Sequence, residues 1–513
     1  MPSLGARRPT FHQIGPRGSD SVRYDNDGNV TRLQDNTGIT NFTYDNLNRQ
    51  TKKVLPDTTT MNYGYDAVSN LTSLQDPGGS VTYAYDQVNE LSSLTEPNGG
   101  ITNFTYNAGY RRTSTAYPNG VTENMSYDSS ERLTQIKATK GPSTLNSFSY
   151  CYNRLNPCST NRTDDTDLRW SVTDVNNATS NYSYNALNRL VSASGAGGSY
   201  SYGYDANGNL TNNNGASQAF NAANELTSSG STTYSFDANG NETGNSAGLS
   251  FSYNAKDQTT SIAAPGQSAL NMTYSGATQT ERVTAGSTNF AYNVLGCGGA
   301  STGVGGNTPY TRDNKGQLVE ERVPGIPNYT PYYYLFDGLG SVVGLSDSAG
   351  AVVNTYSYEP YGKIRTSTGT VANPWLFASG FFDSSTGLYK FGMRYYDASV
   401  GRWTQEDSKP GPNLYVYGAD NPVNNVDPSG ASILCAPAYV AGLVAGGINT
   451  FAWGAAGMGV GILVGAAIGM AMDPLAAIPL GVAGGVIGGF VGIRQGFSGF
   501  IWEMNVLQQM FCS

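Results

Sequence analysis

Few residues in this chain of 513 could do chemistry. The single histidine, His12, lies in a polar N-terminal stretch, so Ser–His–Asp or Cys–His catalysis would depend on that one residue. There is no CxxC motif and no cysteine–histidine spacing typical of a metal site. Cys151 and Cys158 either pair in a small loop or stay as thiols. Carboxylates remain, and several stand in residues 401–431, directly before an abrupt change of composition.

The composition favours a β-rich chain with many turns. Charged residues make up 13%, and the chain holds 64 Gly and 35 Tyr. The net charge is −9, of which −1 belongs to the segment beyond Gly430 and −8 to the rest. An acidic body argues against a nucleic-acid partner, which requires a basic face. No cofactor or metal site is expected.

A repeat of about twenty residues runs through much of the sequence. Each unit has an aromatic residue, any residue, Tyr or Phe, then Asp or Asn, as in YGYDAVSNLTSL at 63–74. In the first six units the second aromatic residue is Tyr24, Tyr44, Tyr65, Tyr85, Tyr106 and Tyr127. Alternation of period two before the Asp predicts a strand, and Asn or Gly after it predicts a turn with positive φ. Each unit is therefore predicted to be a β-hairpin that is stable only when stacked on its neighbours.

These units resemble the RHS/YD-repeat family over roughly residues 20–430. The resemblance implies a mainly β fold, in which a spiralling antiparallel sheet of stacked YD-repeat hairpins forms a hollow shell. A short α-helical apolar C-terminal region is expected to follow. The Tyr-Asp pairs are interpreted as structural, with Tyr packing and Asp binding turn amides. The expected organisation is a polar segment (1–20), YD/RHS repeats (21–330), an RHS repeat-associated core domain (331–430) and a variable C-terminal region (431–513).

The core-domain resemblance is carried by four sequence blocks. They are DxLGS (337–341), YxPYG (358–362), the TGLYxxxxRYYDxxxGR run (386–402) and NLYxYxxNNPxNxxDPxG (413–430), with Ala419-Asp420-Asn421 where the family often has Asn-Asn. The resemblance implies that this domain plugs one end of the shell. It also implies an intramolecular aspartic protease that cuts just after DPxG and leaves the C-terminal peptide inside the shell.

The residues that match the family's site are Asp407, Asp427 and Arg402. Two carboxylates that share a site shift each other's pKa, so that one acts as base and the other as acid toward a water molecule. Arg402 would hold one of them ionised through a bidentate pair. The predicted scissile bond joins Ala431 to Ser432, although the family commonly has a larger apolar residue than Ala431. The alternative is that Asp427 only starts a turn and Asp407 only caps the backbone.

Beyond the core domain the chain becomes strongly apolar. Residues 431–472 carry no charged side chain. Two transmembrane helices are predicted, at about 439–472 and 475–493, because each run is long enough to span a bilayer and glycines recur at intervals of four. A buried helix pair in a soluble toxin domain is the alternative.

Two functions follow from these features. The first is an RHS-type toxin carrier, secreted by or displayed on a bacterium. Its shell would enclose a membrane-active C-terminal peptide released by self-cleavage, with an immunity protein and a target-cell membrane as partners. The second is a structural or adhesive cell-surface protein anchored by its apolar helices.

Overall fold

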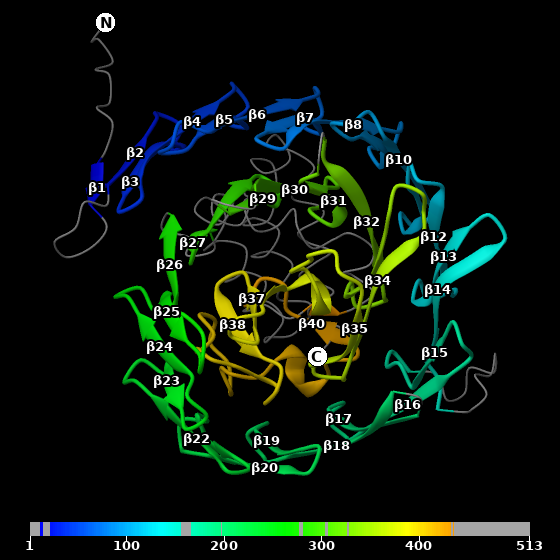
Figure 1. Ribbon diagram of the computed structural model, residues 1–513, viewed down its shortest axis with the longest axis vertical. Helices are drawn as coiled ribbons and strands as arrows, with labels where there is room; N and C mark the ends of the chain where they lie inside the picture. Colours follow the sequence, from blue (N-terminus) through cyan, green and yellow to red (C-terminus); the bar gives the residue numbers. More distant parts are fainter. Residues whose placement is uncertain are drawn as a thin grey trace, which may run out of the picture.

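The computed structural model describes residues 11–13, 21–154, 166–195, 197–275, 281–302, 306–325, 328–431 and 434–435. Within these residues, 35 strands form one sheet, in which each strand pairs antiparallel with the next strand along the chain. Figure 1 shows that this sheet winds as a spiral around a central body. The predicted long sheet of stacked hairpins is confirmed.

The spiral has an outer coil, β1–β26, and an inner coil, β27–β35, which lies within the first half of the outer coil (Figure 1). The first half of the outer coil comprises β1 (Phe11–Gln13), β2 (Ser21–Tyr24), β3 (Val30–Asp35), β4 (Gly38–Tyr44), β5 (Gln50–Val54), β6 (Thr60–Tyr65), β7 (Leu71–Asp76), β8 (Gly79–Tyr85), β9 (Leu91–Thr95), β10 (Ile101–Tyr106), β11 (Arg112–Ala116), β12 (Val121–Tyr127), β13 (Leu133–Lys140) and β14 (Ser143–Cys151). The second half comprises β15 (Ser171–Asp174), β16 (Thr179–Tyr184), β17 (Leu190–Gly195), β18 (Gly198–Tyr204), β19 (Leu210–Asn213), β20 (Ala216–Phe220), β21 (Leu226–Ser229), β22 (Thr232–Phe236), β23 (Glu242–Asn245), β24 (Ser250–Tyr253), β25 (Thr259–Ala263) and β26 (Leu270–Ser275). The inner coil comprises β27 (Glu281–Ala285), β28 (Thr288–Asn293), β29 (Gly296–Thr302), β30 (Gly306–Arg312), β31 (Leu318–Val323), β32 (Thr330–Phe336), β33 (Val342–Ser346), β34 (Val352–Tyr358) and β35 (Ile364–Thr368).

The turn of a typical repeat is built by an acid or amide that directly follows a strand, in most units after an aromatic residue. Asp45 Oδ1 accepts the backbone N–H of Leu47 at 2.9 Å and of Arg49 at 3.0 Å. Asn48 lies between them with φ +61°, a conformation that Asn and Gly adopt most readily. The same pair of bonds is made by Asp25, Asp66, Asp86, Asn107, Asp128, Asn185, Asp205, Asp237, Asn254, Asp313, Asp337 and Asp347. The structural interpretation of these acids is confirmed.

In many units the aromatic residue before that acid or amide ties the hairpin to the one before it. The Tyr85 hydroxyl donates a hydrogen bond to the Leu71 carbonyl at 2.9 Å, and Tyr65 donates to Gln50 at 3.0 Å. Burial raises the pKa of Tyr65 to about 12, so its hydroxyl keeps the proton that it donates. Equivalent bonds are made by Tyr127, Tyr152, Tyr204, Tyr253, Tyr274 and Tyr358. The Tyr-Asp pair therefore closes one turn and also stacks successive units.

The two coils pack face to face through apolar side chains and ion pairs. Leu94 and Val121 of the outer coil share an apolar cluster with Leu335 of the inner coil. Arg112 Nη2 lies 2.6 Å from Asp313 Oδ2, so this buried pair joins strands about two hundred residues apart in sequence. The sheet continues past residue 331 as far as β35.

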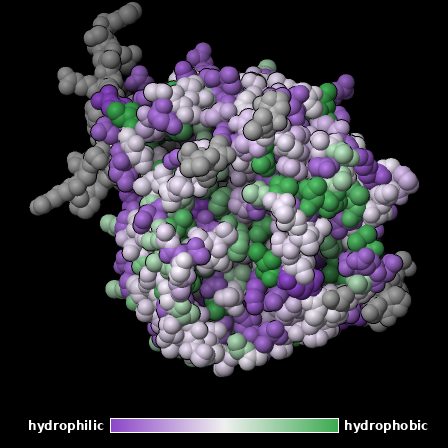
Figure 2. Space-filling model, in the orientation of Figure 1, coloured by the Kyte–Doolittle hydropathy of each residue, from purple (hydrophilic) through white to green (hydrophobic). Residues whose placement is uncertain are grey.

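The chain after β35 forms a separate plug, defined here as residues 375–431. It contains a sheet of β36 (Phe381–Asp383), β37 (Leu388–Phe391), β38 (Arg394–Asp397) and β39 (Arg402–Trp403), the turns η2 (Phe377–Ser379) and η3 (Gly418–Asp420), and β40 (Asn425–Val426). Figure 1 shows it in the middle of the ring, surrounded by strands of both coils. Side-chain hydrogen bonds join it to the wall, such as Tyr415 to the Gly240 carbonyl at 2.8 Å. In Figure 2 the margin of the same view is mainly polar, and apolar residues gather toward its middle and right.

Several expectations concern residues outside this description. The predicted C-terminal spans at 439–472 and 475–493 lie there, as does Cys158. Among the residues that the structure describes, no helix has the length and apolar character needed to cross a bilayer. Cys151 is disulfide-bonded, and Cys297 is a buried free thiol. His12 lies on β1, where its backbone pairs with Val22.

Candidate active site

The sequence Asp427-Pro-Ser-Gly forms a tight turn at the end of the plug. It follows β40, whose residue Val426 pairs antiparallel with Leu434 of β41 (Leu434–Cys435). Asp427 Oδ1 accepts the Ser429 hydroxyl and the Ala431 backbone N–H, both at 3.1 Å. One carboxylate oxygen of Asp427 is therefore bonded to the amide of the residue at which cutting is predicted. Ser432, the other half of the predicted scissile bond, lies outside the described residues.

Arg394 brings the two predicted aspartates together. Its Nη2 lies 2.7 Å from Asp407 Oδ2 and 3.1 Å from Asp427 Oδ2. The Nε–H of the same guanidinium donates to the Gly430 carbonyl, and Nη1 donates to the Leu414 carbonyl at 2.9 Å. One buried cation thus contacts both carboxylates and the backbone of the DPSG turn.

An aromatic ring covers one face of the Arg394 guanidinium. Its guanidinium carbon lies 4.1 Å from the centre of the Trp403 ring, which is a cation–π contact. Burial lowers the pKa of Arg394, while the charges of Asp427 and Asp407 act to raise it. A guanidinium keeps its proton in proteins, so Arg394 remains a fixed positive charge between two acids.

The two acids differ in their access to solvent. The side chain of Asp427 is 2% exposed, and that of Asp407 is 20% exposed. Asp407 is held from the backbone as well, because its N–H donates to the Leu414 carbonyl at 2.9 Å and its Oδ1 accepts the Lys409 N–H at 2.9 Å. Water can therefore approach the pair from the Asp407 side.

The turn between β37 and β38 clamps the DPSG turn from its other side. The Met393 N–H donates to the Ser429 carbonyl at 3.1 Å. Gly392 has φ +38°, and a Cβ there would lie 1.9 Å from the Ser429 carbonyl oxygen. Gly430 has φ +61°, and a Cβ there would lie 2.6 Å from the Phe391 carbonyl oxygen. Two glycines thus allow the backbones to touch, which fixes the turn beside the acids.

The expectation that Arg402 pairs with one of the two aspartates is corrected by the structure. The Arg402 guanidinium donates to the Asn224 carbonyl at 2.8 Å and to the amide oxygens of Asn209 and Asn413, both at 3.3 Å. Its strand β39 pairs with β38 through Asp397 and directs Arg402 toward the outer coil, over the Phe220 ring at 4.6 Å. Burial lowers its pKa to about 10. Arg402 therefore joins the plug to the wall.

Sequence reasoning missed Arg394 as a site residue. It stands in the RYYD block that carried the core-domain resemblance, on a strand whose four residues are all buried. A buried arginine must meet acids or carbonyl groups, so its place in that strand was the available signal.

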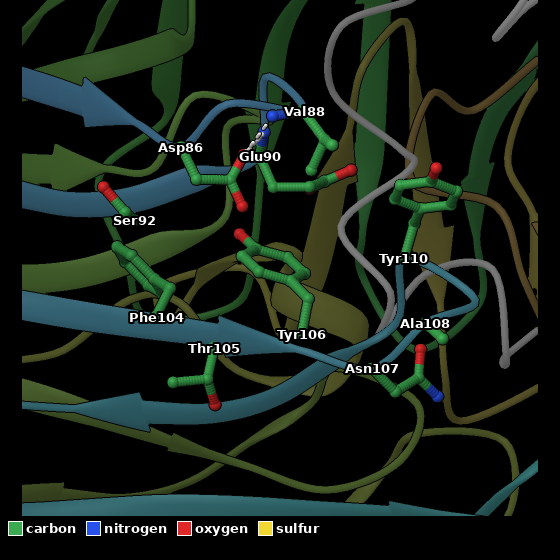
Figure 3. A pocket seen from close by; sticks show the side chains of 10 residues that line it. All are labelled: Asp86, Val88, Glu90, Ser92, Phe104, Thr105, Tyr106, Asn107, Ala108 and Tyr110. Carbon is green, nitrogen blue, oxygen red and sulfur yellow. Dashed lines mark hydrogen bonds between the residues drawn. The ribbon is translucent and has the colours of Figure 1, made fainter.

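A surface pocket far from this site has a structural explanation. Ten residues line it where β8–β9 and β10–β11 turn, among them Val88, Tyr106 and Tyr110 (Figure 3). Its one aspartate, Asp86, already accepts the N–H groups of Val88 and Glu90, both at 2.9 Å, as the dashed lines in Figure 3 show. Among the described residues no group of three His, Cys, Asp or Glu side chains is placed to hold a metal ion.

Comparison with solved structures shows the same fold. A chain of the crystal structure of TcdB2-TccC3-Cdc42 superposes with a TM-score of 0.65 at 18% sequence identity, covering 84% of this chain and 26% of that chain. This likeness concerns the fold alone.

Two curated proteins are related in sequence to part of the chain. The tRNA3(Ser)-specific nuclease WapA of Bacillus spizizenii is 29% identical over 275 residues, or 48% of this chain and 12% of WapA. The double-stranded DNA deaminase toxin A of Burkholderia cenocepacia is 36% identical over 107 residues, or 19% of this chain and 7% of that protein. The chain thus spans a small part of the length of the curated relatives that it matches.

The model of the Teneurin YD-shell family matches residues 19–171 and 162–423. The match covers most of both coils and much of the plug, and it ends shortly before Asp427. Together with the repeated Tyr-Asp turns and the wound sheet, it shows that this chain is an RHS/YD-repeat shell protein and belongs to the Teneurin YD-shell family.

Proposed function

We propose that this chain is part of a toxin carrier whose plug cuts its own backbone after Ala431. The observation that carries the proposal is that Arg394 contacts Asp407, Asp427 and the Gly430 carbonyl at once. Two acids and a fixed backbone turn are the parts that an aspartic protease needs. Since both the acids and the turn belong to one chain, the reaction is intramolecular and occurs once per molecule.

The chemistry requires one water molecule and no cofactor. Asp407, the more exposed acid, takes a proton from a water molecule, and the oxygen of that water attacks the Ala431 carbonyl carbon. The two acids share one proton in the reactive state, and Asp427 carries it and donates it to the Ser432 nitrogen. The C–N bond to Ser432 then breaks, leaving a carboxyl group on Ala431 and an amine on Ser432. Arg394 orients both carboxyl groups throughout, and the Ser429 and Gly430 carbonyl bonds hold the turn still.

The cargo of this carrier is the apolar segment 432–513. The sequence relatives named as a tRNA nuclease and a DNA deaminase toxin each match part of this chain, which supports a carrier that accompanies different effectors. Residues 432–472 contain no charged side chain, which favours a membrane-active peptide over an enzyme. Such a carrier would be secreted by, or displayed on, a bacterium. Its partners would be its own C-terminal peptide, an immunity protein and a target membrane.

The proposal is tested by the intact mass of the purified chain and of Asp427→Asn. The wild type is expected to separate under denaturing conditions into residues 1–431 and 432–513, whereas Asp427→Asn stays whole. Asp237→Asn is the matched control. Asp237 closes the turn of one repeat, and Asn254 closes the equivalent turn of another repeat through the same two bonds, so Asn is tolerated at this position. Cutting in Asp427→Asn at the wild-type level would refute the assignment.

A second candidate is a structural or adhesive cell-surface protein whose plug only closes the shell. Membership of the Teneurin YD-shell family favours this second function. A wild-type chain that stays uncut on purification would make this second function the better account.

A further inference from the structure

Three glutamates lie buried where the inner coil packs against the outer coil. Glu96 follows β9 and Glu123 lies on β12, both in the outer coil, while Glu320 lies on β31 of the inner coil. Their exposed fractions are 2%, 2% and 0%. Carboxylates so deeply buried are costly unless they are paired with cations or protonated.

Glu96 and Glu320 are brought to the same place between the coils, because Glu96 binds the hydroxyl of Tyr333, the residue that pairs with Glu320 across β31 and β32. Glu96 also accepts Thr102 Oγ1 at 2.9 Å and the Tyr333 hydroxyl of the inner coil at 3.1 Å. Glu320 accepts Thr311 Oγ1 at 2.9 Å and the amide of Asn98 in the outer coil at 3.3 Å. Two neighbouring buried carboxyl groups cannot both ionise cheaply, so their surroundings favour a proton on one of them.

Glu123 makes a second link between the coils. Its Oε1 accepts the backbone N–H of Phe336 in β32 at 2.8 Å. Its Oε2 accepts the Tyr117 hydroxyl at 3.3 Å, and that hydroxyl also lies 2.8 Å from the Tyr334 carbonyl. The Tyr117 hydroxyl has one proton, so it can donate to only one acceptor at a time, either Glu123 Oε2 or the Tyr334 carbonyl oxygen. When it donates to Tyr334, Glu123 Oε2 can carry a proton of its own.

The cations at this interface are divided between these glutamates and other acids. Arg112 Nη2 lies 2.6 Å from Asp313, and Arg112 Nη1 donates to Gln317 at 2.9 Å. Lys315 Nζ lies 3.8 Å from Glu90, and Asp76 accepts the amide of Asn293 at 3.0 Å. Arg322 is the cation that pairs with one of the three glutamates, because its Nε lies 3.3 Å from Glu320 Oε2. Arg112 and Arg322 act on Glu123 and Glu96 through their charge alone.

Burial therefore dominates the titration of these groups. It raises the pKa of Glu123 to about 8, against the opposing effects of the Phe336 N–H, Tyr117 and Arg112. Burial also raises the pKa of Glu96 and of Glu320. Repulsion from Glu96 adds to the rise at Glu320, and the positive charge of Arg322 opposes the rise at both glutamates. An acid whose pKa is higher in the closed state than in the open state binds more protons when closed. Closure is therefore favoured at low pH and weakens as pH rises from the ordinary glutamate pKa toward 8.

We propose that Glu96, Glu123 and Glu320 form a proton-held seam, which keeps the inner coil packed on the outer coil in acidic surroundings and releases it as the pH rises. The seam acts on the shell and is independent of cutting in the plug. A shell of this kind would stay closed in an acidic compartment and would loosen on reaching neutral or alkaline surroundings. Within that pH window, each unit of rise in pH lowers the ratio of closed to open shell by at most about tenfold for each such glutamate.

The test is hydrogen exchange of the full chain, followed by mass spectrometry from pH 5 to pH 9 and corrected for intrinsic exchange. Peptides from β12, β31 and β32 report on the seam, and the Phe336 N–H bonded to Glu123 is its most direct reporter. Peptides from β38 report on the plug. We expect protection of the seam to fall by at least about tenfold between pH 6 and pH 8 while β38 keeps its protection.

Glu123→Gln and Glu320→Gln, alone and combined, mimic the protonated acid and should flatten this pH dependence. Glu131→Gln is the matched control, because the Glu131 side chain is 43% exposed. A wild-type seam whose protection is constant from pH 5 to pH 9 would overturn the proposal. So would a loss of protection that β38 shares equally, or an unchanged slope in the combined variant. If the variants do not fold, the wild-type comparison of seam and plug decides alone.

Discussion

Exchanging each of two buried arginines for lysine separates the role of Arg394 from that of Arg402. Arg394→Lys keeps the charge but loses the fork that reaches Asp407, Asp427, Gly430 and Leu414 together. A lysine can meet one or two of these acceptors, so part of the buried network is left unpaired. Breaking a buried ion pair costs about 3–5 kcal/mol, and we expect a loss of unfolding free energy in the lower part of that range because one pairing survives.

The effect on cutting should be larger than the effect on stability. Displacing a reacting group by about 1 Å can slow a reaction by about 100-fold, and lysine cannot hold both carboxyl groups in their present positions. Arg402→Lys is the matched variant, since Arg402 is equally buried but binds Asn209, Asn224 and Asn413. It should lose about 1.5–3 kcal/mol through weakened bonds to a charged group, yet cut at nearly the wild-type rate.

Cutting is followed by intact mass, as the fraction of cut chain against time after cell-free synthesis. Stability is measured separately by denaturant unfolding, with each arginine substitution placed in the Asp427→Asn chain so that the chain stays uncut. Slow cutting in Arg394→Lys with near-normal cutting in Arg402→Lys is the expected pattern. The reverse pattern would refute the assignment of Arg394 to the site and restore the one based on Arg402.

Two further predictions concern the glycine clamp and the tyrosine ties. Gly392→Ala should prevent cutting, because its Cβ would collide with the Ser429 carbonyl. Gly387→Ala is the control, since Gly387 also has a positive φ but faces open space, and this variant should cut normally. Intact mass distinguishes the two variants, and equal cutting in both would contradict the clamp. Tyr85→Phe removes the hydroxyl bond to Leu71 and should lower the unfolding free energy by about 0.5–1.5 kcal/mol in denaturant titration, while Tyr110→Phe at an exposed turn should have little effect. A cost for Tyr110→Phe as large as that for Tyr85→Phe would argue against the ties.

Local sequence chemistry predicted the repeat well because each unit carries its own instructions. The Asp45 carboxylate and the positive φ of Asn48 depend only on neighbours within four residues, so the turn could be read from residue types. The alternation before Tyr44 likewise specifies a strand without reference to the rest of the chain. The winding of the sheet was available only through the family resemblance.

Contacts between distant segments could not be read in this way. Arg112 meets Asp313, and Glu123 meets the backbone of Phe336, only because the second coil returns inside the first. The same cause explains why the sequence pointed to Arg402, although Arg394 is the arginine that contacts the two aspartates. Both arginines lie on adjacent plug strands, and which of them faces Asp427 depends on strand pairing and on the wall behind Arg402.

The most direct test of the account is to sequence the N-terminus of any small fragment released from the purified wild-type chain by denaturation. The account predicts a fragment that begins at Ser432 and is missing from Asp427→Asn. A chain that remains whole, or a fragment that begins elsewhere and persists in Asp427→Asn, would contradict self-cleavage at the DPSG turn.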